Sequence, residues 1–254
     1  LGTSSVHLHT INDLAAPPPT AGSRPGITNT GPVGTLTASG SVTFNDPNVT
    51  LQNLDIIGSV TVNAPGCSLL NCRVSAGGAD YAVKTNAGVD FTIEDVDILN
   101  FGSQGIIQLS GGSITGRRLN IHESQKDGLL CNSNALFEDC WIHHLGLFPT
   151  SHADGTQLQQ GNNVTYRRCF FDLPSPGNAD SPPDIVAGGY RSDACFRVQT
   201  RNGPSGNYLL EDCWINGGNY SFQVEWSNDV DLAHANTARF DPFDASSSGA
   251  WYGP

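Results

Sequence analysis

One short pattern occurs seven times along this chain of 254 residues and constrains its fold more than any other feature. Each copy has an apolar residue or Gly, a spacer, usually Asn or Asp, then Leu, Val or Cys, a second spacer, and Ile, Val or Phe. The copies occupy residues 51–56, 69–74, 93–98, 116–121, 137–142, 166–171 and 210–215. Counted from the fourth position, the steps between copies are 18, 24, 23, 21, 29 and 44 residues. A period of about 20 to 25 residues is typical of a solenoid, in which each repeat packs on its neighbours.

The composition identifies the kind of solenoid. Gly makes up 29 of the 254 residues, charged residues only 14%, and the repeated segments carry Val, Ile, Thr and Phe. A helical or leucine-rich repeat would need long stretches of Ala, Leu, Glu and Lys. The sequence therefore predicts an all-β fold, a parallel β-helix of about eight to ten coils in which each strand pairs with its copies about 4.8 Å above and below.

The third position of the repeat predicts a bend between two strands. Asn and Asp tolerate the left-handed backbone conformation that a tight bend requires, and stacked copies would form a ladder of side-chain hydrogen bonds. Arg118 and Arg168 occupy this position in two copies, and those two bends are expected to be built differently.

A second family of strands precedes the repeats, so each coil is expected to have at least three strands. These segments are residues 81–84, 104–108, 127–131, 154–158 and 220–224. We expect residues 1–32 to form a linker or cap, 33–227 the β-helix and 228–254 a C-terminal cap. The connections that follow His143 and Asp172 are long, and we expect them to wall a groove on the middle coils.

Charge and hydropathy exclude several classes of protein. The formal net charge of −12 argues against a nucleic-acid binder. No stretch approaches the roughly 18 consecutive apolar residues of a membrane span, and no signal segment stands at the start. The chain begins at Leu1 and has no Met, which indicates a processed or excised segment.

Seven cysteines are present, and four of them fall on the fourth position of the repeat: Cys72, Cys140, Cys169 and Cys213. That column should point inward, as a stack of small buried hydrophobic residues. A vertical disulfide such as Cys140 to Cys169 is the alternative, and no spacing resembles a zinc site.

Three stretches carry a family resemblance. They are PGITNTGPVGTLTASGSVTF followed by VTLQNLDIIGSVTVNAPGCSLLNCRV, SHADGTQLQ followed by NNVTYRRC, and the ending ARFDPF with GAWYGP. Together they resemble the right-handed parallel β-helix proteins of actinobacteria and their phages, which include minor tail proteins and share an H-x-D-G-x-Q segment. Thr156 replaces the usual aliphatic residue of that segment.

The resemblance implies a single-stranded right-handed β-helix and an extracellular or virion location. A wider similarity to pectate-lyase-like enzymes and phage tailspikes implies a site on a strand face beside long loops. By the same analogy, a homotrimer is expected.

The repeats bring two aspartates together. Aligning the copies stacks Asp127 beneath Asp154 and Leu130 beneath Gln157, with Lys126 and His152 in the adjoining loops. Asp127, Asp154, His152 and Lys126 are therefore the candidate catalytic residues. Two such carboxyl groups suit glycoside hydrolysis, or lyase chemistry on a uronate with or without Ca²⁺ held by the aspartates, or sugar binding alone. The alternative is an ordinary Asp-Gly turn that repeats in two coils.

A further set of residues is expected to bind substrate. The same alignment places His122 beneath His143 with Asp172 above, and sets exposed Trp141 and Phe170 on adjacent coils in a line with Trp214 two steps higher. The aromatic line is either a platform for sugar rings or a surface covered by a partner subunit or by the C-terminal segment. The candidate substrate-binding residues are His122, His143, Gln157, Arg167, Arg168, Trp141 and Phe170.

Two hypotheses remain. Eight of the twelve basic residues lie between Arg117 and Arg201, which favours an enzyme that cleaves an anionic cell-surface glycan, either a lyase or a hydrolase. The alternative is a non-catalytic glycan-binding, receptor-binding or structural module of a phage tail.

Overall fold

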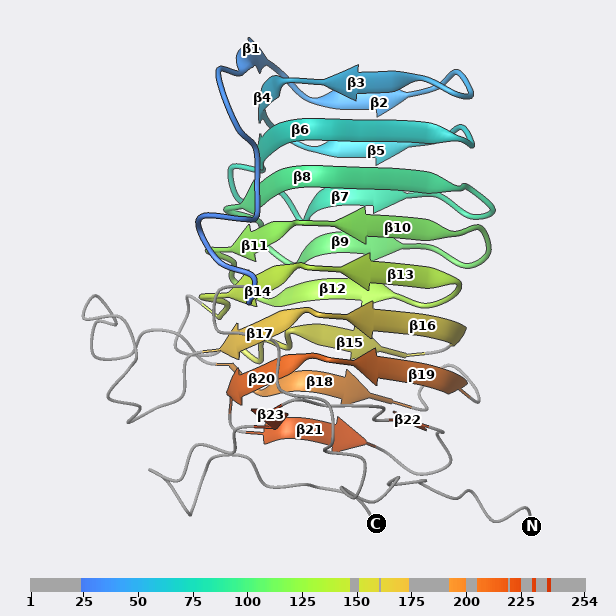
Figure 1. Ribbon diagram of the computed structural model, residues 1–254. Coiled ribbons are helices and arrows are strands. Elements are labelled where there is room, and N and C mark those ends of the chain that lie inside the picture. The colour runs from blue at the N-terminus through green and yellow to red at the C-terminus, as the bar shows by residue number, and fades with distance from the viewer. Residues whose placement is uncertain are drawn as a thin grey trace.

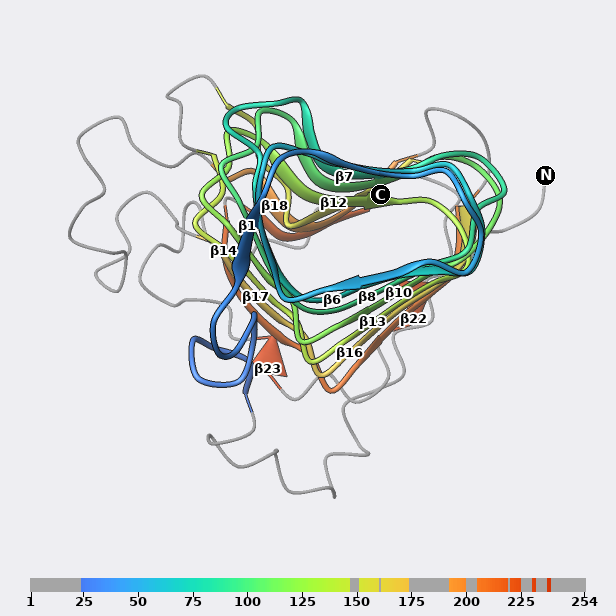
Figure 2. The same ribbon diagram turned by 90° about the horizontal axis from the view of Figure 1, so that it is seen from above.

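The computed structural model describes residues 24–146, 151–159, 161–173, 192–199, 205–218, 220–224, 230–231 and 237–238. Its described secondary structure consists of β-strands that pair in parallel and stack in one column (Figure 1). Seen along the column, the coils superimpose around a flattened interior (Figure 2). The predicted parallel β-helix is confirmed, and no described segment forms a helix long and apolar enough to cross a membrane.

One sheet has eight strands, one from each coil. In order they are β2 (Val42–Phe44), β5 (Val60–Val62), β7 (Tyr81–Thr85), β9 (Gln104–Gln108), β12 (Asp127–Cys131), β15 (Thr156–Leu158), β18 (Ala194–Val198) and β21 (Tyr220–Val224). This sheet contains the second strand family expected from the sequence.

The other sheet has fifteen strands and contains the repeats. They are β1 (Thr37–Ser39), β3 (Thr50–Gln52), β4 (Leu54–Ile57), β6 (Cys67–Ser75), β8 (Phe91–Leu99), β10 (Ile114–Arg117), β11 (Asn120–His122), β13 (Ala135–Glu138), β14 (Trp141–His143), β16 (Gly161–Arg167), β17 (Phe170–Leu173), β19 (Ser205–Glu211), β20 (Trp214–Gly217), β22 (Val230–Asp231) and β23 (Thr237–Ala238). In β6 and β8 one strand runs through the bend, and β8 pairs with both β10 and β11. Each middle coil therefore has the expected three strand segments.

All seven third positions of the repeat adopt the left-handed conformation, with φ between 50° and 58°. Where Asn occupies the bend, the expected ladder forms: Asn71 Nδ2 donates to Asn53 Oδ1 at 2.7 Å. The role that the sequence assigns to this position is therefore confirmed.

The expectation that Arg118 and Arg168 are bent differently is wrong. Both have φ of 50°, like their Asn and Asp counterparts. Arg118 donates through Nε and Nη2 to the two carboxylate oxygens of Asp95 at 2.6 and 2.8 Å, and Arg168 donates to Asp139 at 2.7 and 2.8 Å. Because the guanidinium reaches the Asp of the preceding coil in a bidentate pair, Arg continues the ladder as an ion pair.

A second charge ladder occupies the residue before each bend. Glu94, Arg117, Glu138, Arg167 and Glu211 alternate in sign from coil to coil. Arg117 donates to Glu94 at 2.6 Å and to Glu138 at 3.0 Å, and Arg167 donates to Glu138 at 3.0 Å. These half-exposed pairs are each worth about 0 to 1 kcal/mol, so they set the register more than they stabilise the fold.

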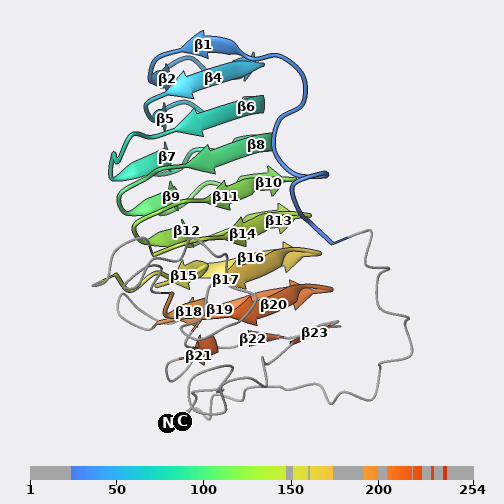
Figure 3. The same ribbon diagram turned by 90° about the vertical axis from the view of Figure 1, so that its left-hand side faces the viewer.

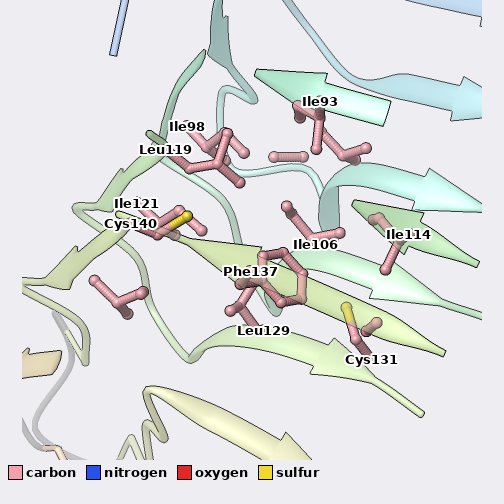
Figure 4. Packing of buried hydrophobic residues seen from close by; sticks show 14 of the residues in the cluster. Ile93, Ile98, Ile106, Ile114, Leu119, Ile121, Leu129, Cys131, Phe137 and Cys140 are labelled. Carbon is pink, nitrogen blue, oxygen red and sulfur yellow. The ribbon is translucent and has the colours of Figure 1, made fainter. Parts of the chain in front are cut away.

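The interior is built from inward columns of apolar side chains, one residue per coil. One such column comprises Ile56, Val74, Ile98, Ile121, Ile142, Phe171 and Ile215, all fully or almost fully buried. Figure 4 shows how such side chains interdigitate between the sheets around Phe137 and Leu129. Each buried aliphatic or aromatic side chain contributes roughly 1.5 to 3 kcal/mol, so the column supplies much of the stability.

The cysteines belong to this interior. The fourth-position cysteines Cys72, Cys140, Cys169 and Cys213 point inward as predicted, and all seven cysteines of the chain are buried and free. Their reading as small buried hydrophobic residues is confirmed.

The terminal segments differ from simple caps. Residues 24–33 run along the flank of the column, across the coils (Figures 1 and 3). At the other end, β22 and β23 pair with β19 and β20 and extend the stack. The rest of the two expected caps and most of the two long loops, at residues 147–150 and 174–191, lie outside the described residues.

The left-handed backbone at the bend predicts that Gly is tolerated better than Ala there. Arg168→Gly should be more stable than Arg168→Ala by about 1 kcal/mol, because both lose the ion pair but only Gly is free of left-handed strain. Urea denaturation of the two variants measures the difference. Arg73, which lies within strand β6, is the control: there the Ala variant should be more stable than the Gly variant. An Ala variant more stable than the Gly variant at position 168 would contradict the prediction.

Candidate functional site

The two aspartates are stacked as predicted. The β12–β15 pairing sets Leu129 opposite Thr156, which places Asp127 in register with Asp154 and Leu130 with Gln157. Asp127 is only 5% exposed and Asp154 only 1%. The pair is therefore almost entirely removed from solvent.

Each carboxylate bonds to the backbone of the next coil. Asp127 Oδ1 accepts from the backbone N–H of Asp154 at 2.9 Å, and Asp154 Oδ1 accepts from that of Ala194 at 3.0 Å. Asp127 Oδ2 also accepts from Gln104 Nε2 at 3.2 Å. The aspartates thus form a vertical ladder that satisfies buried N–H groups, which is a structural task in its own right.

The glycine that follows each aspartate is required by close packing of the coils. A Cβ on Gly128 would lie 2.7 Å from the carbonyl oxygen of Gly155, and one on Gly155 would lie 2.5 Å from that of Cys195. The Asp-Gly dipeptide therefore reflects the approach of one coil to the next.

Two further charged residues complete what we call the aspartate cluster: Asp127, Asp154, Asp193 and Arg197. Arg197 Nη1 lies 3.6 Å from Asp154 Oδ2 and 2.9 Å from Asp193 Oδ2. Sequence reasoning counted Arg197 only among the basic residues and missed Asp193. The pairing of β15 with β18 sets Gln157 opposite Arg197 and would have identified both residues. This pairing could not be predicted from the repeat spacing, because a long irregular connection separates the two strands.

Burial raises the pKa of both aspartates. Burial raises the pKa of Asp127 from 3.8 to about 6, against the lowering effect of its hydrogen bonds and of the charges on Lys126 and Arg197. The pKa of Asp154 is raised well above 3.8, first by burial and then by the charge on Asp127. Both carboxyl groups therefore hold their protons to a higher pH than an ordinary aspartate, and the charge on Asp127 raises the pKa of Asp154 further, as in acid–base pairs.

The remaining predicted residues of this site lie at its edge. Gln157 Nε2 donates to Asp154 Oδ2 at 3.4 Å, and Gln157 Oε1 accepts from Gln159 Nε2 at 2.8 Å. Lys126 adjoins Asp127 in the chain, and its charge lowers the pKa of Asp127. His152 has a side chain that is 82% exposed, with Nδ1 4.0 Å from Asp193 Oδ2. The structure therefore joins His152 to the cluster through Asp193.

The aspartates do not fit a Ca²⁺ site. Both oxygens of Asp127 and Oδ1 of Asp154 already accept hydrogen bonds from the protein. Among the residues that the structure describes, no group of three or more His, Cys, Asp or Glu side chains could hold a metal ion. We therefore derive no chemistry from a metal.

A second cluster lies on β8, β11 and β14. The rings of His122 and His143 stack at 4.9 Å, as their alignment predicts, and Trp141 stacks on His143 at 3.5 Å. His143 Nε2 hydrogen bonds to Asn120 Oδ1 at 2.9 Å, and His122 Nε2 hydrogen bonds to Asp97 Oδ1 at 2.8 Å.

Since Asn120 Oδ1 and the Asp97 carboxylate only accept hydrogen bonds, both histidines carry the proton on Nε2. Burial lowers the pKa of His143 to about 2, and the charges on His122 and His144 act in the same direction. His143 is therefore neutral and fixed in place.

The aromatic line has a cover that the sequence did not predict. Trp141 and Phe170 are in register on adjacent coils, as expected, but Trp214 lies one coil beyond Phe170 and not two, because the long connection adds no coil. The guanidinium of Arg24, from the N-terminal segment, lies 4.5 Å from the centre of the Phe170 ring, and Phe170 is 5% exposed. The exposure expected of Phe170 is wrong, because this chain itself covers the ring, and the assignment of Phe170 to sugar binding stays a prediction.

Arg167 and Arg168 lie away from the aspartates. They stand at the bend between β16 and β17 in the fifteen-stranded sheet, where they pair with Glu138, Glu211 and Asp139. Their assignment to substrate binding is therefore not supported, since both guanidiniums neutralise carboxylates of neighbouring coils.

Comparison with known proteins agrees with this architecture. A family model described as a right handed beta helix region matches residues 36–181, which is more than half of the chain. The protein therefore belongs to the right-handed β-helix family, a domain common in enzymes that act on polysaccharides and in polysaccharide binders. A search of curated proteins and a search of solved structures found no match.

The raised pKa of Asp127 predicts how stability depends on pH. Because the folded pKa of about 6 exceeds the unfolded value of 3.8, Asp127 favours folding fully below pH 3.8, and this contribution is lost as the pH rises through about 6. Asp127→Asn should therefore increase the free energy of unfolding at pH 8, by on the order of 3 kcal/mol, and change it little at pH 4.

Thermal or urea denaturation at the two pH values measures this difference. Asn keeps an oxygen for the Asp154 N–H, and the Gln104 amide can turn to meet the new NH₂ group. Equal effects of the substitution at both pH values would rule out a buried, titrating carboxyl group.

Proposed function

We propose that this β-helix hydrolyses a polysaccharide at the aspartate cluster, with Asp154 as the proton donor and Asp127 as its ionised partner. The observation that carries the proposal is the pair itself: two buried carboxyl groups, stacked one coil apart, whose surroundings raise the pKa of both. Gln157 and Arg197 add planar polar groups beside Asp154, which suit hydrogen bonding to sugar hydroxyls.

The proposed reaction follows from these roles. Asp154 passes its proton to the glycosidic oxygen as the bond from that oxygen to the anomeric carbon breaks. Asp127 either takes a proton from the attacking water or first bonds to the anomeric carbon and is then released by water. Arg197, held by Asp193, is a positioning residue, because it fixes the Asp154 carboxyl.

Hydrolysis suits this site better than lyase chemistry. A lyase needs uncommitted cations to neutralise a uronate carboxylate and a base to remove the adjacent C–H proton. Arg117, Arg118, Arg167 and Arg168, half of the basic residues that suggested an anionic glycan, are paired in the two charge ladders. The proposal therefore does not require an anionic substrate.

The second candidate function is glycan binding without cleavage. It is supported by the backbone hydrogen bonds of Asp127 and Asp154, which give both residues a structural task whether or not they react. In that case the same polar face recognises the glycan, and no bond breaks.

The setting of the protein is part of the proposal. A polysaccharide substrate lies outside the cell, so we propose an extracellular or virion-tail location, in keeping with the resemblance to actinobacterial and phage β-helix proteins. A homotrimer is proposed by the same analogy.

Substitution of the proton donor separates the two functions. Asp154→Asn should lower the release of reducing ends from a mixed-polysaccharide panel by at least about 100-fold, because the general acid is lost. Its melting temperature should be preserved, since Asn Oδ1 still accepts from Ala194.

Asp139→Asn is the matched control, because it changes an Asp of the preceding coil in the charge ladder, and it should keep the activity. Equal activity of Asp154→Asn and the wild type would exclude Asp154 as the acid. Glycan binding by the wild type with no release of reducing ends would establish the second function instead.

A further inference from the structure

Residues 24–33 form a strap that crosses the coils instead of joining a sheet. Figure 3 shows this segment descending from the first coil along the flank of the column, and Figure 2 shows it outside the cross-section. We call it the N-terminal strap.

The strap is fixed at three points. Near its C-terminal end, the backbone N–H of Val33 donates to Asn71 Oδ1 at 2.7 Å, and Asn71 Nδ2 donates to Val33 O at 2.9 Å. Further down the column, the Gly31 N–H donates to Arg118 O at 2.8 Å. At the other end, Arg24 lies over Phe170.

Between these points the strap interacts mainly with itself. The Asn29 and Thr30 N–H groups donate to Gly26 O, and Gly26 N–H donates to Asn29 Oδ1, so residues 26–30 close their own turn. Ile27 is 77% exposed and does not pack on the column. Pro25, Thr30 and Gly31 are buried, but Arg24 and residues 27–29 are exposed. A segment that is only partly buried opens at a lower free-energy cost than the fully buried strands beneath it.

The surface under the strap is aromatic and polar. Asn120, Trp141 and Phe170 follow one another on successive coils, and the strap meets the first and third of these coils at Gly31 and Arg24. The coil of Trp141 lies between those two contacts. Displacement of the strap would therefore uncover Phe170 and open the coil of Trp141 beside it, with Trp214 on the next coil of the line.

The indole N–H of Trp141 lacks a hydrogen-bond acceptor among the described residues. This nitrogen is also buried. An unsatisfied buried N–H group destabilises the covered state. An aromatic face beside a free N–H donor suits a ring that carries hydroxyl groups, which is the chemistry of a sugar.

We propose that the N-terminal strap is a displaceable cover over a second carbohydrate-binding platform, formed by Trp141, Phe170 and Trp214. Its ligand is a stretch of neutral polysaccharide, whose rings stack on the aromatic residues and whose hydroxyls accept from the Trp141 indole. The inference rests on the proposal that the protein engages polysaccharides. This platform belongs to the fifteen-stranded sheet, whereas Asp127 begins β12 and Asp154 lies just before β15, both of the eight-stranded sheet.

A disulfide can lock the strap. A Cβ built on Gly31 lies 3.6 Å from Asn120 Cβ, within the range found in disulfides. Gly31 has φ of 75°, so a Cys there is strained, but the oxidised and reduced forms share this strain. In the double variant Gly31→Cys and Asn120→Cys, the oxidised form should hold the strap closed and the reduced form should release it. The wild type and Asn120→Cys alone, carried through the same oxidation, control for the seven buried native cysteines and for the lost Asn120 side chain.

Binding is measured by affinity electrophoresis in gels that contain dextran, galactomannan or arabinogalactan. The oxidised double variant should bind at least 10-fold more weakly than the same protein after reduction. Arg24→Ala, which removes the contact over Phe170, should bind several-fold more tightly than the wild type, and adding Trp141→Ala should abolish that gain.

Equal mobility shifts in the oxidised and reduced forms would overturn the proposal. So would the failure of Arg24→Ala to bind any of the three polysaccharides, a test that holds even where the double variant does not fold. Release of reducing ends by the same samples tests the role of Asp154 separately. The hydrolysis proposal and the platform proposal can therefore be contradicted independently of each other.

Discussion

In-register stacking of the coils is the constraint on which the rest of this structure depends. The strands pair in parallel with equivalent residues opposite one another, so a side chain at one repeat position meets its own copy in the next coil. The left-handed bend at seven equivalent positions keeps this register, whether the residue is Asn, Asp or Arg. The apolar columns, the charge ladders and the stacked aspartates of the described coils all follow from it.

The same stacking explains why the aspartate pair is chemically unusual. A single buried Asp with a backbone hydrogen bond is a structural feature, but a second copy one coil away adds a like charge in a buried site. Burial and this like charge both disfavour the ionised form of Asp154, so its pKa is raised well above 3.8. A solenoid can thus create a coupled acid pair simply by repeating a turn, and Arg197 moderates the repulsion.

The sequence was sufficient for features that repeat and insufficient for those that do not. The period predicted the coils, the inward cysteines, the stacked histidines and the Asp127–Asp154 pair, because each depends only on register. Arg118 and Arg168 were misjudged, since propensity alone does not reveal an Asp one coil earlier. Asp193 and Arg24 were missed because they reach their partners from segments outside the repeat, where no spacing specifies the contact.

Titration of the two carboxyl groups tests the central claim most directly. Carboxyl ¹³C shifts of the intact chain, assigned with Asp127→Asn and Asp154→Asn, report when each aspartate loses its proton. The account predicts that one group of the pair titrates near pH 6. The other should lose its proton only at a pH well above the pKa of an ordinary aspartate. Two carboxyl groups that both titrate near pH 3.8 would contradict it.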